Sequence, residues 1–168
     1  KTKDKNKISF YIGVPFCPTR CYYCSFTSNS IDKNKELVKP YIDSLVLEIK
    51  EVSKYLISKG VKVQSIYIGG GTPTSLEAYE LDILLNCINE FWEGFEEFTC
   101  EAGRPDTITV EKLKTMKEAG INRLSINPQT MDDNTLKKIG RKHDSGQIIE
   151  AYYLARSLGF DNINMDVI

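Results

Sequence analysis

Apolar positions recur along the chain in two patterns that alternate. Short apolar runs bounded by Gly, Pro or polar residues are typical of buried strands, and apolar residues spaced three and four apart indicate amphipathic helices. The first pattern predicts strands over residues 8–14, 63–68, 95–101, 122–126 and 162–167. The second predicts helices over residues 41–59, 74–93, 109–120, 132–139 and 146–158.

Several predicted helix boundaries carry their own signals. Pro40 suits the first turn of the first helix, and Gly60 suits its end. Thr74 and Glu77 have the spacing of a capping box, which predicts that the second helix opens at Thr74. Thr109 is a suitable N-cap for the third helix.

The alternation of strands and helices predicts an α/β fold. Strands that alternate with helices of this length form βαβ units around a parallel sheet, and right-handed crossovers would curl about five such units into part of a barrel. The connection after the first strand is the exception among short linkers, since it runs for roughly 25 residues. This connection contains a cluster of cysteines.

Three cysteines, Cys17, Cys21 and Cys24, lie within eight residues in the spacing CxxxCxxC. Three thiolates from one loop can bind three irons of a [4Fe–4S] cluster, which leaves the fourth iron without a protein ligand. A small molecule with an amine and a carboxylate can chelate that iron. The motif therefore predicts a catalytic cluster rather than a plain electron carrier, which usually has four cysteine ligands.

Other uses of these cysteines are weaker interpretations. A zinc site needs four ligands, and the remaining candidates, His143, Cys87 and Cys100, lack a zinc-like spacing from the loop. A disulfide framework does not suit a chain of this length with five cysteines and no signal peptide. We expect Cys87 and Cys100 to be buried as small hydrophobic residues, and His143 to be exposed.

Polar residues and glycines follow the predicted strands. In parallel α/β folds ligands bind at the carboxyl ends of the strands. The cysteines follow the first strand, and the ends of the next four bring residues 69–74, Glu101, residues 127–129 and Asp166. We expect all of these to meet at one face. Taken singly, the glycines could be a tight turn, the carboxylates could cap helices, and Arg141 could be a solvated charge.

The composition of the chain limits the classes of partner that it is expected to bind. The chain of 168 residues has 22 basic and 23 acidic residues, a net charge of −1, so no basic surplus favours nucleic acid or a membrane surface. No apolar run approaches the roughly 20 residues of a membrane span. Thiolate ligands need a reducing compartment, so we expect a cytoplasmic protein. The polar start without Met and the end directly after a strand predict a piece of a longer protein.

Six motifs resemble one known family. The cysteine motif and the following GGGTPT resemble the radical S-adenosylmethionine (SAM) superfamily. Within it, the chain resembles the oxygen-independent coproporphyrinogen III oxidases, most of all their paralogues in anaerobic Gram-positive bacteria. The motifs are YIGVPFC (11–17), CYYCSF (21–26), GGGTPT (69–74), EAGRP (101–105), SINPQT (125–130) and IGR (139–141).

The resemblance implies a partial (β/α)6 radical SAM barrel, of which residues 1–168 would be the N-terminal part, ending after about five strands. It implies a [4Fe–4S] cluster and SAM, which one-electron reduction cleaves to methionine and a 5′-deoxyadenosyl radical. In the oxidases this radical starts the decarboxylation of coproporphyrinogen III propionates to vinyl groups. An electron donor such as flavodoxin or ferredoxin is implied as well.

The resemblance also implies roles for individual residues. The cluster would be held by Cys17, Cys21 and Cys24. The methionyl part of SAM would be contacted by Gly70, Gly71 and Thr72, and its carboxylate by Arg141. The sugar would be contacted by Glu101, Gln129 and Asp166, the adenine by Tyr23, and Tyr11 would occupy a catalytic position beside the cofactor.

Two departures from the typical oxidase leave a second function open. Gly13 stands where the typical oxidase has His, and Phe26 stands where it has a further Cys. Phe at this place also occurs in haem-chaperone relatives, which bind haem without decarboxylation. The small-molecule substrate is therefore a porphyrinogen, or else the ligand is haem.

Overall fold

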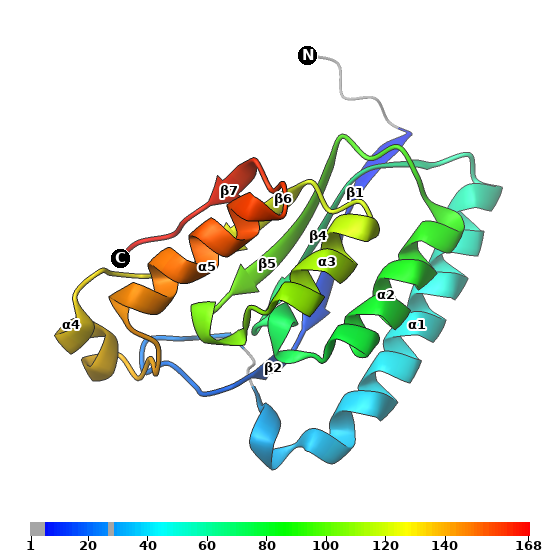
Figure 1. Ribbon diagram of the computed structural model, residues 1–168. Coiled ribbons are helices and arrows are strands. Elements are labelled where there is room, and N and C mark those ends of the chain that lie inside the picture. Colours follow the sequence, from blue (N-terminus) through cyan, green and yellow to red (C-terminus); the bar gives the residue numbers. More distant parts are fainter. Residues whose placement is uncertain (1–5, 27–28) are drawn as a thin grey trace.

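The structure is a computed structural model that describes residues 6–26 and 29–168, and a parallel β-sheet forms its centre (Figure 1). The sheet has five strands in the order β1-β4-β5-β6-β7, and all neighbouring strands are parallel. Their bounds are Lys7–Val14 (β1), Lys62–Gly70 (β4), Glu97–Gly103 (β5), Arg123–Ile126 (β6) and Asn162–Asn164 (β7). Strands adjacent along the chain are thus adjacent in the sheet, as the predicted α/β fold requires.

Helices α1, α2, α3 and α5 cover one face of this sheet (Figure 1). Helix α4 lies apart from them, near the loop that follows β1 (Figure 1). The helix bounds are Lys35–Ser58 (α1), Ala78–Phe91 (α2), Val110–Glu118 (α3), Asp133–Lys138 (α4) and Ser145–Ser157 (α5). A curved parallel sheet with helices along one side is a partial barrel, and the prediction of this fold class is confirmed.

The two faces of the sheet differ in chemistry. The face toward the helices is apolar, and the hydrophobic core lies there; its fully buried strand residues are Val14, Ile66, Ile68, Phe98, Cys100, Ala102, Leu124 and Ile126. On the other face a polar and aromatic row crosses the sheet in register, from Tyr11 through Tyr67, Thr99 and Arg123 to Asn162. This alternation places site residues on the concave side of the partial barrel.

The first helix starts earlier than predicted. It begins at Lys35 instead of Tyr41, so Pro40 lies inside the helix rather than in its first turn. The extra turn buries Val38 in the core, and Leu37 N donates to Asn34 O at 3.0 Å. Burial of an apolar side chain therefore outweighs the backbone hydrogen bond that proline cannot donate.

The predicted capping box at Thr74 and Glu77 is wrong. Residues Pro73–Ser75 form a 3₁₀ turn, and α2 begins after it with a capping box made by Glu77 and Glu80. Thr74 instead points into the protein, where its hydroxyl donates to Ala102 O at 2.6 Å. The glycine turn (residues 69–72) is thus followed by a short 3₁₀ turn that ties it to β5.

Two further features were not predicted. Strands β2 (Phe16–Cys17) and β3 (Asn29–Ser30) form a small parallel sheet that closes the cysteine-containing connection. The last strand ends at Asn164 rather than Val167, which makes only an isolated bridge with Gln129. Among the described residues, no helix is both long and apolar enough to cross a membrane.

Candidate functional site

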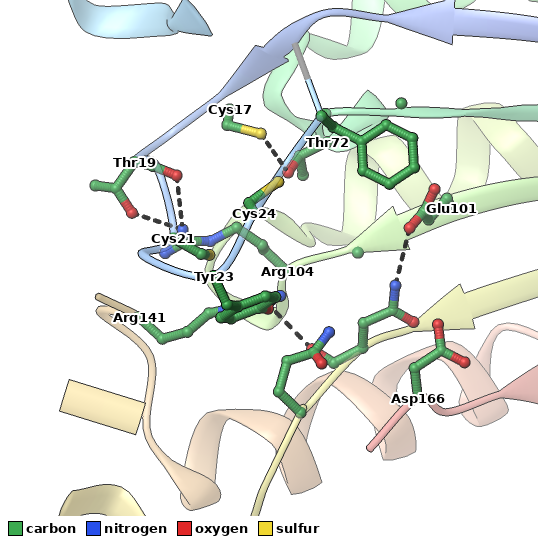
Figure 2. A pocket seen from close by; sticks show the side chains of 16 residues that line it. Cys17, Thr19, Cys21, Tyr23, Cys24, Thr72, Glu101, Arg104, Arg141 and Asp166 are labelled. Carbon is green, nitrogen blue, oxygen red and sulfur yellow. Dashed lines mark hydrogen bonds between the residues drawn. The ribbon is translucent and has the colours of Figure 1, made fainter. Parts of the chain in front are cut away.

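A cavity opens where the strands end, between the cysteine loop (residues 15–26) and the ends of β4, β5 and β6 (Figure 2). The cysteines, the glycines, Glu101, residues 127–129 and Asp166 were expected there because carboxyl ends of parallel strands share one edge. The lining residues are Cys17, Thr19, Cys21, Tyr23, Cys24, Phe26, Gly70, Gly71, Thr72, Glu101, Gly103, Arg104, Asn127, Gln129, Arg141 and Asp166. Eleven of the twelve predicted site residues are therefore brought together, and Tyr11 is the exception.

The three thiols of the cysteine loop are reduced and face this cavity. Cys17 Sγ lies 3.4 Å from Thr72 Oγ1. Burial raises the pKa of the Cys17 thiol, although Thr72 and the positive charge of Arg104 act in the opposite direction. Bound iron would remove this proton, because metal coordination deprotonates a thiol outright.

The glycine turn fixes the start of the cysteine loop through its backbone. Gly71 N donates to Val14 O at 2.7 Å, and Thr72 N donates to Phe16 O at 2.7 Å. A Cβ atom on Gly71 would lie 2.6 Å from Phe16 O and 3.0 Å from Cys17 Sγ. Only glycine therefore allows the turn to approach Cys17 this closely.

Two carboxylates lie on the opposite side of the cavity (Figure 2). Glu101 Oε1 accepts from Asn127 Nδ2 at 3.0 Å, and burial followed by the charge of Asp166 raises the pKa of the Glu101 carboxyl. Gln129 brings Asp166 into place, since Gln129 N donates to Asp166 O at 3.0 Å. These oxygens can accept hydrogen bonds from the hydroxyls of a ligand.

Arg141 supplies a cation to the same cavity. Its Nη2 donates to the Tyr23 hydroxyl at 3.0 Å, and its Nη1 donates to Asn127 O at 3.3 Å. Its Nε is buried and has no hydrogen-bond partner among the described residues. A buried guanidinium with a free donor is suited to an incoming carboxylate, which would satisfy that group.

The donor set fits an iron–sulfur cluster better than a single metal ion. Among residues 6–26 and 29–168, no three His, Cys, Asp or Glu side chains are grouped so as to hold one ion. A [4Fe–4S] cluster needs another arrangement, because each thiolate binds a different iron of the cube. Three thiols around a cavity, with Gly71 keeping the space beside Cys17 open, have the chemistry that this cluster requires.

Tyr11 lies outside the lining of this cavity, on the concave face of β1. Its ring stacks on Tyr67, with ring centroids 5.9 Å apart and planes 9° from parallel. It lines a separate hollow that Tyr41 and Glu48 also border. Tyr11 therefore does not line the cavity that the three cysteines border, and its catalytic role stays a prediction.

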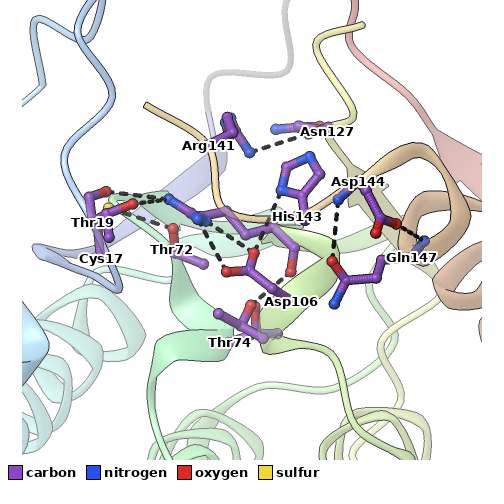
Figure 3. Close-up of polar contacts among 12 residues, drawn as sticks. Cys17, Thr19, Thr72, Thr74, Asp106, Asn127, Arg141, His143, Asp144 and Gln147 are labelled. Carbon is purple, nitrogen blue, oxygen red and sulfur yellow. Dashed lines mark hydrogen bonds and ion pairs between the residues drawn. The ribbon is translucent and has the colours of Figure 1, made fainter. Parts of the chain in front are cut away.

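Sequence reasoning missed several residues at the site and placed one wrongly. Arg104 and Thr19 line the cavity but were not predicted as site residues, and Asn127 was expected at this face only as part of residues 127–129. The prediction that His143 is exposed is wrong: only 3% of it is accessible, and its Nδ1 lies 3.5 Å from Asp106 Oδ1 (Figure 3). The one available signal was the position of Arg104 directly after a strand, where site residues gather. Cys87 and Cys100 are buried as predicted.

Comparison with known proteins gives a consistent result. A family model described as the radical SAM superfamily matches residues 11–168. The oxygen-independent coproporphyrinogen-III oxidase-like protein HemZ of Bacillus subtilis is 46% identical over 167 residues, which cover 98% of this chain and 33% of that protein. The heme chaperone HemW of the same species is 40% identical over 163 residues, covering 95% of this chain and 41% of that protein.

A solved structure has the same fold. It is that of the Escherichia coli coproporphyrinogen III oxidase HemN, described as a radical SAM enzyme. Its TM-score is 0.82 at 27% identity, covering 96% of this chain and 36% of the other. The chain thus spans about a third of the relatives with oxidase names and 41% of the chaperone.

Proposed function

This chain belongs to the radical SAM superfamily, and from that premise we propose that it is the cluster- and SAM-binding part of a longer oxidoreductase. The observation that carries this proposal is the convergence on one cavity of three thiols, a glycine turn, a buried arginine and two carboxylates. A cluster with an open iron supplies, when bound, the electron that cleaves SAM reductively.

The residues of the chain divide the binding between them in this proposal. Cys17, Cys21 and Cys24 hold the cluster, and Arg141 receives the carboxylate of SAM through its free Nε. The backbone groups of the glycine turn, with Gly70, Gly71 and Thr72, are open to the methionyl part of SAM.

The other end of the cavity suits a sugar. Glu101, Gln129 and Asp166 present oxygen acceptors for the hydroxyls of ribose, and we assign the adenine to the ring of Tyr23, which lines the same cavity. Asn127 holds Glu101 in its orientation through the hydrogen bond to Oε1. Tyr11 and Tyr67 lie farther along the concave face, where a substrate would enter the barrel.

For the reaction itself, we propose oxidative decarboxylation of a porphyrinogen propionate, as in coproporphyrinogen III oxidases. The support is 46% identity to HemZ, whose name is that of an oxidase-like protein. A one-electron donor protein such as flavodoxin or ferredoxin would supply the electron that reduces the cluster.

Haem binding without decarboxylation is the second candidate. One observation favours it besides 40% identity to HemW: Phe26 is largely exposed and lines the mouth of the cavity. An exposed aromatic ring beside a cavity offers a surface to a planar macrocycle.

The first test measures cluster binding by the full-length protein. Anaerobic reconstitution should load about four irons per chain, the content of one cube. Cys24→Ala should lose the brown colour and nearly all iron, because one of three ligands is removed. Cys87→Ala is the matched control and should keep the iron content of the unaltered protein. Loss of iron in Cys87→Ala with retention in Cys24→Ala would contradict the ligand assignment.

The second test separates the two candidate functions. The reconstituted full-length protein is incubated with reductant and SAM, with coproporphyrinogen III in one sample and haem in another. Release of carbon dioxide together with 5′-deoxyadenosine would support decarboxylation. Stoichiometric haem binding without carbon dioxide release would support the chaperone-like function.

A further inference from the structure

Arg104 is a buried charge at the base of the cysteine loop, and it contacts two segments. The residue directly follows β5 and is 2% exposed. Its Nε and Nη2 each donate to one oxygen of Asp106, both at 3.0 Å. Its Nη1 donates to Thr19 Oγ1 at 2.6 Å and to Thr19 O at 3.3 Å. The guanidinium therefore links a carboxylate on one side to the cysteine loop on the other.

Thr19 is the point at which this link acts, because it lies between Cys17 and Cys21. Its hydroxyl donates to Gly140 O at 3.3 Å while accepting from Arg104. One turn further along the loop, Tyr22 N donates to Ile139 O at 3.1 Å. The central part of the cysteine motif is thus held by Arg104 and by residues 139–140, which follow α4.

Asp106 and His143 complete the group behind Arg104. Figure 3 shows Asp106 between Thr19 and His143. Although burial alone would raise the pKa of the Asp106 carboxyl, His143 and Arg104 hold that pKa well below its usual range. The carboxylate is therefore ionised, and it compensates the buried charge of Arg104, which would be costly to bury alone.

The shape of the guanidinium matters as much as its charge. Arg104 uses three nitrogens in one plane, two toward the carboxylate and one toward Thr19. A lysine has the same charge on a single nitrogen and cannot span both partners in this way. Arg104 also lines the cavity, so it lies beside the space that a cluster would fill.

We propose that Arg104, oriented by Asp106, is a positioning residue that holds the cysteine loop in its cluster-binding conformation before any iron is bound. This inference rests on the proposed function, since a pre-formed loop serves cluster loading. The alternative is that Arg104 only stabilises the fold as a buried ion pair. The two differ in where the effect of a substitution is felt: in the loop alone, or throughout the molecule.

The test compares hydrogen exchange and cluster assembly in the full-length protein. In the iron-free state, Arg104→Lys and Thr19→Val should speed amide exchange in residues 17–24 by about tenfold, because a charged hydrogen bond to the loop is lost. Exchange in β4 and β5 should stay unchanged. Both variants should assemble the cluster severalfold more slowly, as followed by its absorbance. The electron paramagnetic resonance spectrum of the reduced cluster should be broader in both variants than in the unaltered protein.

Two controls keep the result specific. Thr19→Ser retains the hydroxyl and should behave as the unaltered protein does. Arg123→Lys alters a partly buried arginine that pairs with Glu97 at 3.2 Å, away from the cavity, and should leave loop exchange and cluster assembly unchanged.

Each outcome decides the question. Unchanged loop exchange and normal cluster assembly in Arg104→Lys and Thr19→Val would overturn the inference. If Arg104→Lys raises exchange everywhere, Thr19→Val decides, because it removes one hydroxyl and no core contact. If the unaltered protein binds no cluster, the proposed function fails. The exchange data on the iron-free protein still show whether Arg104 holds the loop.

Discussion

Two regions of the molecule are stabilised in different ways. One is the sheet with the helices that cover it, here called the layer, and the other is the cysteine loop. In the layer, large apolar side chains such as Phe98 and Leu84 have no accessible surface. In the loop, Phe16 at the start is 2% exposed and packs in the core, but Tyr22 is 83% exposed and Phe26 is also exposed. The conformation of the loop depends in addition on hydrogen bonds from Arg104 and the glycine turn. The stabilisation from apolar burial is non-directional, whereas a hydrogen bond depends on the distance and angle between its donor and its acceptor. The loop can therefore be displaced while the layer stays folded.

The largest expected effect is in the layer. Phe98→Ala should lower the free energy of unfolding by about 3–5 kcal/mol, because it leaves a cavity in the centre of the core. Phe98 also packs edge-on against Phe95, with ring centroids 5.0 Å apart. Urea unfolding of the iron-free protein measures the change. Tyr22→Ala in the loop should stay within about 0.5 kcal/mol of the unaltered protein. Similar losses in both variants would contradict the comparison.

An intermediate effect is expected at the contact between the two regions. Gly71→Ala should destabilise the fold by about 1–3 kcal/mol, because the added methyl group meets backbone and forces it to shift. The nearest atoms are Phe16 O at 2.6 Å and Cys17 Sγ at 3.0 Å. Since Cys17 must move, we also expect iron binding to fall by more than this loss of stability would explain. Urea unfolding and iron analysis together measure the two effects.

Gly13→Ala is the matched control for this substitution. Among the residues that the structure describes, its added methyl group would meet only Tyr11 within 4 Å, at an ordinary contact distance of 3.6 Å. We expect normal iron binding and little change in stability. If Gly71→Ala were as harmless as Gly13→Ala, the close approach of the glycine turn to the loop would not be required.

The same contrast explains which features the sequence predicts. Strong apolar periodicity placed β4 and α2 to within a few residues, because burial of those side chains determines the structure. The start of α1 and the role of Thr74 were predicted wrongly, since each depends on a tertiary contact: Val38 with the core, and Thr74 with Ala102 O. Propensity and capping rules contain no information on such contacts.

The candidate site likewise contains residues that the sequence predicts and residues that it does not predict. The rule that strand ends meet at one edge predicted Cys17, Gly71, Glu101 and Asp166 together. The position of Arg104 after a strand indicated its place at this edge, but its contact with the cysteine loop could not be predicted, because its partner Thr19 lies 85 residues away in the sequence. Contacts of this kind follow from the assembled fold, and they connect the loop to the layer.

The smallest expected effect concerns Glu101, where binding chemistry and stability oppose each other. Burial and the charge of Asp166 raise the pKa of this carboxyl in the folded protein. Such a group binds its proton more tightly when folded. Its contribution to stability is therefore full below the unfolded pKa of about 4.3 and is lost as the pH rises through the folded value.

Glu101→Gln, which carries no charge at any pH, should therefore raise the melting temperature of the iron-free protein by about 1–3 °C at pH 7. The gain should vanish below about pH 4, where Glu101 itself is protonated. Glu150→Gln, on the exposed side of α5, is the control and should change little at either pH. The same Glu101→Gln should weaken SAM binding by the reconstituted protein, since a carboxylate acceptor is lost. A variant that is less stable at pH 7 would mean that the hydrogen bond from Asn127 and its neighbours outweighs the burial of this charge.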